Sequence, residues 1–283
     1  MPELPEVETV RRALQPVMEG ARFQKVVARR PDLRVALPAR FAARLTGKTV
    51  VRLGRRAKYL FAELSSGETL LMHLGMSGSF RIDLATPGAF HHARGSAQAH
   101  DHVVFRMSSG ATVTFNDPRR FGLMELVATD ALHAHRVFRL LGPEPLDVEF
   151  DAARLASALH QKKTNLKAAL LDQRVIAGLG NIYVSEALHL ARLSPRRRAS
   201  TIATSTGTPR PEARRLVQAI RKVLNLALAR GASADGEDSS NRDDEFRVYD
   251  REGKRCRRSG CDGTIRRIVQ AGRSTFYCPV CQR

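Results

Sequence analysis

The sequence has no long apolar run and, outside its last 28 residues, no cysteine. No stretch approaches the ~18 apolar residues that a membrane-spanning helix needs, which argues against a membrane protein. No signal peptide is recognisable, so we expect a cytoplasmic protein. Acidic residues are scarce, because 28 Asp and Glu stand against 47 Lys and Arg, for a net charge of +19. Such an excess indicates a polyanionic partner, of which nucleic acid is the commonest.

The four cysteines form two closely spaced pairs, Cys256-x4-Cys261 and Cys278-x2-Cys281. In a reducing cytosol, paired short spacings are typical of a tetrahedral Zn²⁺ site rather than of disulfides. Four thiolates and no fifth cysteine leave no open position on the ion for a substrate. The sequence therefore predicts one structural zinc ion held by all four cysteines.

The first ~130 residues predict mainly β structure after an opening helix. Short apolar stretches separated by turn signals favour a sandwich or barrel, and they cover 23–27, 50–53, 59–64, 69–74, 103–107 and 112–115. A hairpin turn at Ser108-Ser109-Gly110 separates the last two stretches. The proline-rich segment 141–150 marks a domain boundary.

Beyond that boundary the apolar period becomes helical. Asp151 is a candidate N-cap, and further helices are predicted over 165–171, 182–190 and about 211–230, the last ending at Gly231. Residues 235–245 are acidic without an apolar period, which predicts a mobile loop. We therefore expect an α+β multidomain chain, with a β-sandwich domain at 1–135, a helical DNA-binding domain at 136–234, an acidic loop at 235–248 and a zinc-finger domain at 249–283.

The N-terminus, MPELPEVETV, carries a candidate nucleophile. Pro5 can start a helix, and Pro2 and Glu3 lie before it, where a cap does not require them. Proline at position 2 usually permits removal of Met1, which would expose a secondary amine that is nucleophilic near neutral pH. Its attack on a carbonyl-level carbon forms an iminium ion, an electron sink for lyase chemistry, and Glu3 can transfer the proton. If Met1 is retained, the Pro2 nitrogen cannot react, and a non-catalytic binding protein is the alternative.

Seven blocks in order along the whole chain resemble bacterial formamidopyrimidine-DNA glycosylases, the oxidised-purine repair enzymes of the Fpg/Nei family. The resemblance implies a bifunctional DNA glycosylase and AP lyase of base excision repair. Such an enzyme acts as a monomer on damaged double-stranded DNA, at the nucleoid of a bacterial cytoplasm, and cuts by β,δ-elimination. The blocks are MPELPEVETVRR (1–12), RRAKYL (55–60), HLGMSGSFRI (73–82), NDPRRFG (116–122), LGPEPL (141–146), GLGNIYVSEAL (178–188) and GRSTFYCPVCQR (272–283).

The resemblance also implies roles for individual residues. An enzyme that acts on a base inside duplex DNA must extrude it, and side chains that fill the hole offset the lost stacking. From sequence alone Met76 and Phe121 would be core residues, but they match the family's void-filling residues. Lys167 is a plausible neighbour of the matched DNA contact Lys163, and Glu186 matches a carboxylate that braces the N-terminal site. The implied catalytic residues are Pro2, Glu3, Lys58 and Arg273, and the implied DNA contacts are Met76, His100, Arg119, Phe121, Lys163 and Asn181, the last in a helix–two-turn–helix motif.

The match departs from the family in two places. The first cysteine pair is usually Cys-x2-Cys, and here two residues are inserted. Residues 231–249 are acidic and shorter than the family's segment, and they lack the Gly-Tyr-Phe-like stretch that closes over the flipped purine. The resemblance still implies removal of oxidised purines, 8-oxoguanine and formamidopyrimidines, but this segment puts the lesion preference in doubt. The alternative is an enzyme for oxidised pyrimidines of the endonuclease VIII type, whose start is typically Pro-Glu-Gly-Pro.

Overall fold

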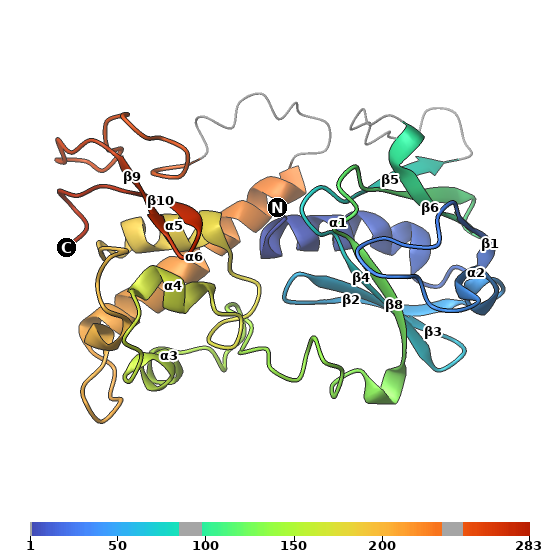
Figure 1. Cartoon of the computed structure of the whole chain (residues 1–283), viewed down its shortest axis with the longest axis horizontal. Coiled ribbons are helices and arrows are strands. Elements are labelled where there is room, and N and C mark those ends of the chain that lie inside the picture. Colours follow the sequence, from blue (N-terminus) through green and yellow to red (C-terminus); the bar gives the residue numbers. More distant parts are fainter. Residues whose placement is uncertain (1, 85–97, 234–245) are drawn as a thin grey trace. The chain divides into compact units, whose positions relative to one another are not determined.

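The computed structural model describes residues 2–84, 98–233 and 246–283 (Figure 1). The chain divides into two compact units, Met1–Arg139 and Leu140–Arg283. Met1 and most of the predicted acidic loop lie outside the described residues. The predicted zinc-finger segment belongs to the same compact unit as the helical region. The finer division into four parts stays a prediction.

The described part of the first unit contains two four-stranded antiparallel sheets, with strand orders β1-β6-β7-β5 and β2-β3-β4-β8. Large apolar side chains of both sheets share one buried core, including Phe23, Phe105 and Phe115 from one sheet and Leu53, Leu60 and Met72 from the other. The predicted sandwich is therefore confirmed. The strands are β1 (Phe23–Ala28), β2 (Val50–Arg56), β3 (Tyr59–Leu64), β4 (Glu68–His73), β5 (Ser79–Leu84), β6 (Asp101–Met107), β7 (Ala111–Asn116) and β8 (Leu123–Ala128).

Helix α1 (Leu4–Met18) opens this unit and packs against β2 (Figure 1). Its N-cap is Glu3, whose backbone N–H donates to the Glu6 carboxylate at 2.8 Å. Glu3 does precede Pro5, but the prediction that a cap does not require it is wrong. The helix starts one residue before Pro5, which is tolerated in the first turn because no intrahelical partner awaits its missing N–H. A short helix, α2 (Phe41–Leu45), precedes β2.

Within its described residues, the second unit has four α-helices and one hairpin: α3 (Ala152–Leu159), α4 (Leu166–Leu171), α5 (Asn181–Leu190), α6 (Pro211–Ser233), and β9 (Arg266–Gln270) with β10 (Arg273–Tyr277). The Asp151 carboxylate caps α3 by accepting from the Arg154 N–H at 2.7 Å, as predicted. Gly231 does not end α6, which continues to Ser233. A helical glycine near a terminus costs only about 1 kcal/mol, which a packed helix tolerates.

The helices enclose their own apolar core, and α5 packs against both α6 and β10. The zinc-finger segment contributes a separate small cluster around Val248, Ile265 and Phe276. Within the described residues, no helix combines the length and apolar character that crossing a membrane requires. The α+β architecture with a C-terminal β-hairpin agrees with the sequence prediction.

Candidate active site and nucleic-acid interface

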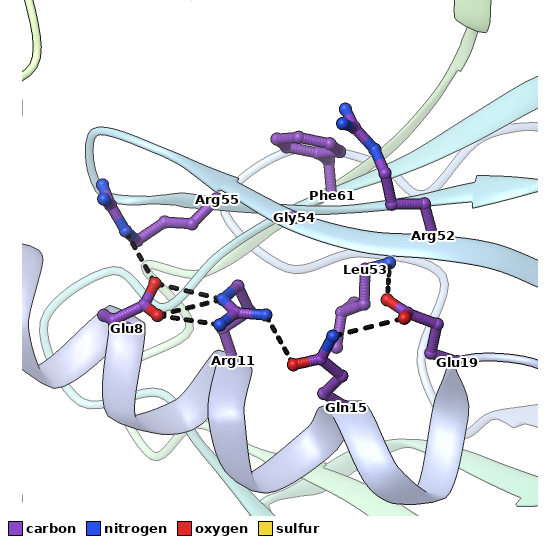
Figure 2. Close-up of a pocket in the computed structure, with 9 residues that line it drawn as sticks. All are labelled: Glu8, Arg11, Gln15, Glu19, Arg52, Leu53, Gly54, Arg55 and Phe61. Atoms are coloured by element: carbon purple, nitrogen blue, oxygen red, sulfur yellow. Dashed lines mark hydrogen bonds and ion pairs between the residues drawn. The ribbon is translucent and has the colours of Figure 1, made fainter. Parts of the chain in front are cut away.

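A chain of side-chain hydrogen bonds, here called the polar ladder, links α1, the helix that follows Pro2 and Glu3, to strand β2 (Figure 2). Glu8 accepts hydrogen bonds from Arg11 at 2.8 Å and from Arg55 of β2 at 3.1 Å. Burial raises the pKa of Glu8, but hydrogen bonds and charge from Arg11 and Arg55 more than offset it, so the net pKa is lowered. Glu8 is therefore ionised at neutral pH and joins the helix to the sheet through two guanidinium groups.

The ladder continues toward the other end of α1. Arg11 donates to the Gln15 side-chain oxygen at 2.9 Å, and Gln15 donates to Glu19 at 3.2 Å. Glu19 in turn accepts from the Leu53 backbone N–H at 2.8 Å, back on β2. Helix α1 is thus attached to β2 through Glu8 in its second turn and through Glu19 at its C-terminal end, which fixes the helix that follows Pro2 and Glu3.

Lys58 lies in the tight turn between β2 and β3. Arg56 pairs with Tyr59, which leaves Ala57 and Lys58 as a two-residue turn, and Ala57 has φ +54°. Arg55 donates to the Ala57 carbonyl at 2.9 Å, so the guanidinium that binds Glu8 also holds this turn. Lys58 is only 8% exposed. A lysine at a hairpin turn is ordinarily solvated, and its burial favours a specific role.

The surroundings of His73, at the end of β4, lower its pKa. Burial, then the Lys58 charge and then the Arg34 charge lower the pKa of His73 from 6.5 to about 4. Its Nδ1 accepts the Gly75 backbone N–H at 2.9 Å, which requires a neutral ring with the proton on Nε2. The ring therefore supports the loop after β4 without adding charge beside Lys58.

This depressed pKa predicts acid sensitivity of the N-terminal unit. In the unfolded chain His73 takes up a proton as the pH falls below about 6.5, whereas in the folded chain it does so only near about 4. The free energy of unfolding should therefore decrease as the pH is lowered from about 6.5 to about 4. We expect His73→Asn, which keeps an acceptor for Gly75, to show a shallower fall in urea titrations from pH 7.5 to 4.5. Parallel curves for variant and wild type would contradict the assignment.

The loops that carry Met76, Arg119 and Phe121 meet in the first unit. Met76 and Phe121 are 42% and 43% exposed, although large apolar side chains normally enter a core. The Arg119 guanidinium lies over the Phe121 ring, 5.0 Å from its centroid. Exposed apolar side chains beside a planar cation match what filling a vacated base stack needs, so the core interpretation of Met76 and Phe121 is wrong.

Asp117, which sequence reasoning passed over, holds these two loops together. It is fully buried and accepts from the Ser77 hydroxyl at 2.6 Å and from the Gly122 N–H at 2.7 Å. Ser77 then accepts from the Arg119 backbone N–H at 3.2 Å. The sequence contained a signal for this role, because an Asp side chain at the start of a turn often accepts hydrogen bonds from the backbone of that turn.

Gly75 allows the close approach of the loops and yields a second prediction. It has φ +64°, and a Cβ there would collide with the Phe121 carbonyl and approach the Gly122 nitrogen to 2.6 Å. Gly67 has φ +78° and open space around it. Gly67→Ala should cost only the left-handed backbone, roughly 1–2 kcal/mol. Gly75→Ala should cost about 1–3 kcal/mol more from the collision, as read from urea unfolding. Equal costs for both variants would contradict this packing.

In the second unit, Asn181 is the first residue of α5, and its amide is held on both sides. Its Nδ2 donates to the Ser274 carbonyl at 2.9 Å, and its Oδ1 accepts from Lys167 Nζ at 2.6 Å. Lys167 Nζ also donates to the Ser274 carbonyl at 2.9 Å and to the Thr275 hydroxyl at 2.7 Å. Lys167 is fully buried, so it does not lie on the surface beside Lys163. It instead joins α4, α5 and β10.

Arg273 is exposed at the start of β10, directly after the turn formed by Ala271 (φ +48°) and Gly272 (φ +71°). Positive φ at both positions is typical of a type I′ hairpin, so Arg273 is the first strand residue after a tight turn. Lys163 is also exposed, as a phosphate contact requires, and His100 is half-buried. The DNA contacts of these three residues stay predictions.

Glu186 binds the start of the zinc-finger segment. Its carboxylate accepts the backbone N–H groups of Arg247, Val248 and Tyr249 at 2.8–2.9 Å. It is 6% exposed. Glu186 therefore anchors the chain where it enters the zinc-finger segment, and its bracing of the N-terminal site stays a prediction.

The four cysteines converge on one point. Their sulfur atoms all lie within 4.8 Å of one another, with Cys261 and Cys278 at 3.6 Å and Cys256 and Cys281 at 3.9 Å. A tetrahedral ion with Zn–S bonds of about 2.3 Å places its sulfurs about 3.8 Å apart. The donor set and spacing fit one structural zinc ion, and the two additional residues between Cys256 and Cys261 do not prevent the convergence.

Comparisons with known proteins agree with this combination of parts. Three family models match in chain order: the formamidopyrimidine-DNA glycosylase N-terminal domain at residues 1–124, its H2TH domain at 141–238, and the zinc finger found in FPG and IleRS at 253–283. The chain belongs to the formamidopyrimidine-DNA glycosylase family. It is accordingly a DNA glycosylase of base excision repair, in a family whose members are also AP lyases.

Relatives match this family assignment over their full length. Formamidopyrimidine-DNA glycosylases of Bradyrhizobium sp. strain BTAi1 and Afipia carboxidovorans are 60% and 58% identical, with each chain covered completely. The Lactococcus lactis enzyme bound to DNA with an abasic site has a TM-score of 0.83 at 32% identity, again with both chains fully covered. Full-length similarity to named enzymes disfavours the non-catalytic alternative.

Proposed function

We propose that this glycosylase removes oxidised purines, 8-oxoguanine and formamidopyrimidines, from duplex DNA and cuts the strand on both sides of the lesion. The observation that carries the proposal is the N-terminus, where Pro2 precedes a buried Glu3 that caps a helix attached to strand β2 at two points. Two solved relatives support the substrate class: MutM in complex with DNA containing carbocyclic 8-oxo-G, and a Lactococcus lactis variant in complex with DNA containing Fapy-dG.

In the proposed reaction the Pro2 nitrogen bonds to C1′ of the extruded nucleotide and the bond from C1′ to the base breaks. Glu3 protonates the sugar ring oxygen, the ring opens, and an iminium joins the Pro2 nitrogen to C1′. Loss of a C2′ proton then expels the 3′ phosphate. A second elimination expels the 5′ phosphate, and water releases Pro2 from the remaining sugar fragment.

Two basic residues are proposed to serve the eliminations. Lys58 is held in the turn that Arg55 joins to α1, and its burial restricts it to few orientations. Arg273 presents a rigid donor fork suited to a phosphate, at a hairpin that the cysteine cluster staples. We assign Lys58 to proton transfer or to the neighbouring phosphate in the first elimination, and Arg273 to the second.

DNA binding is proposed to depend on the positive net charge and on exposed side chains that can enter the base stack. The net charge of +19 attracts the phosphates, and Met76, Arg119 and Phe121 are proposed to enter the stack when the base leaves. His100, Lys163 and Asn181 are proposed to contact phosphates. The protein acts as a monomer in this proposal, at the nucleoid of a bacterial cytoplasm.

Oxidised pyrimidines form the second candidate substrate class. One solved Lactococcus lactis complex contains DNA with an oxidised pyrimidine, and the segment that would close over a purine is shorter here than in the family. The same catalytic residues would serve either class, so only the choice of base differs.

The test compares end-labelled duplexes that contain 8-oxoguanine or thymine glycol, with products resolved on a sequencing gel. The proposal predicts faster cleavage at 8-oxoguanine and phosphate at both new ends. Arg273→Ala should stop at the product of the first elimination, with an unsaturated sugar left on the 3′ end. Faster cleavage at thymine glycol would reverse the substrate assignment. Phosphate at both ends with Arg273→Ala would remove the role of that residue.

A further inference from the structure

The predicted zinc cluster has a polar neighbour from outside the zinc-finger segment. His189, on α5, is fully buried, and its Nε2 lies 3.3 Å from Cys256 Sγ. The two residues are 67 positions apart in the chain. Helix α5 is the helix that begins with Asn181, so this contact joins the helix–two-turn–helix motif to the metal cluster.

The imidazole is placed to donate to the sulfur rather than to bind the ion. Four cysteine sulfurs already complete a tetrahedral set, which leaves no vacant position for a fifth ligand. Over the part of the chain that the structure describes, His189 Nδ1 has no hydrogen-bond partner. Cys256 is thus the polar partner that this buried ring has, and a proton on Nε2 satisfies both the ring and a thiolate.

The enlarged knuckle between Cys256 and Cys261 holds the contact from the other side. Its Arg258 donates through Nη2 to the carbonyl of His189 and, at 3.3 Å, to that of Leu190. Carbonyls in the last turn of a helix lack intrahelical donors, so a guanidinium is a suitable partner there. Arg258 therefore docks the knuckle onto the end of α5, beside His189.

We propose that His189 positions Cys256 by donating an Nε2–H hydrogen bond to its zinc-bound thiolate, and that this bond slows loss of the ion. A donor stabilises the negative charge on the sulfur and fixes its direction toward the metal. Removal of such a partner typically costs 10- to 100-fold in metal affinity. The proposal concerns the zinc site alone and does not depend on which lesion the enzyme removes.

The first test measures zinc release from the full-length zinc-loaded protein into a chromophoric chelator. His189→Phe keeps a ring of similar size without a donor, and His189→Gln keeps an N–H donor. We expect release about 10-fold faster from His189→Phe and close to the wild-type rate from His189→Gln. Leu188→Val is the packing control, because Leu188 belongs to the helical core and not to the zinc cluster, and it should release zinc at the wild-type rate.

The second test replaces zinc with Co²⁺ and records the sulfur-to-cobalt charge-transfer band. Loss of a hydrogen bond raises the energy of the sulfur electrons, so the band should move to longer wavelength in His189→Phe and stay in place in His189→Gln. A wild-type release rate or an unmoved band in His189→Phe would overturn the proposal. Equal acceleration in the Phe and Gln variants would also overturn it, since the effect would then come from packing of the ring.

Discussion

Glu3→Gln is expected to lower the rate of base excision by about 10²- to 10⁴-fold, the usual contribution of a positioned general acid. Glu3 is 2% exposed at the N-cap of α1, directly after the proposed nucleophile. Glutamine keeps the shape and the acceptor oxygen of this side chain but cannot deliver a proton to the sugar oxygen. Single-turnover kinetics on an 8-oxoguanine duplex measure the effect.

The same variant should retain much of its strand cleavage at a pre-formed abasic site. There the base is already gone and part of the sugar is an open aldehyde, so attack by Pro2 needs no ring opening by Glu3. Glu6→Gln is the matched control, because it keeps the acceptor for the Glu3 N–H in the same turn. It should lower excision by less than about 10-fold. Equal losses on both substrates would contradict the role of Glu3 as the acid.

Lys167→Met is expected to have the largest effect on stability. The buried ammonium donates to Asn181, to the Ser274 carbonyl and to Thr275. Methionine fills a similar volume but leaves these acceptors without that donor, and each unsatisfied buried group costs about 1–3 kcal/mol. We expect the second unit to lose about 3 kcal/mol or more in urea unfolding. DNA affinity should fall as well, because the Lys167 ammonium would no longer link Asn181 to strand β10, which begins at Arg273.

Lys163→Met provides the contrast. Lys163 is exposed and four residues away, so its removal should leave the free energy of unfolding unchanged and reduce only the salt-dependent part of DNA binding. Measured together, the two lysines separate a structural cation from a phosphate contact. A stable Lys167→Met protein with wild-type unfolding would contradict the buried network.

The strands that the sequence predicts are those with strong local patterns. Strand β3 agrees with the prediction to the residue, because a dense apolar run lies between two turn signals. Strands β5 and β8 were missed, and each lies at the edge of its sheet. Every residue of β5 is only half-buried, so its sequence carries no alternation to detect. Edge position alone does not explain the two misses, because the edge strands β1 and β2 were predicted.

In the candidate site too, local sequence patterns were predictable and long-range contacts were not. The motif matches identified Pro2, Lys58 and the four cysteines, since these depend on residue type and spacing. The burial of Lys167 was not predictable, because its partners Ser274 and Thr275 come from a strand more than 100 residues later. The contact of His189 with Cys256 likewise depends on how α5 packs against the zinc-finger segment. Long-range packing, rather than local propensity, decides both.

Borohydride trapping on a duplex with 8-oxoguanine opposite cytosine tests the central claim most directly, with peptide mass spectrometry to locate the adduct. The account predicts a covalent protein–DNA adduct at the Pro2 nitrogen of the wild-type protein, lost or sharply reduced in Pro2→Gly. Mass analysis of the intact protein must first show that Met1 has been removed. An adduct at a lysine, or no adduct on 8-oxoguanine or on an abasic site with Met1 absent, would contradict catalysis by the N-terminal proline.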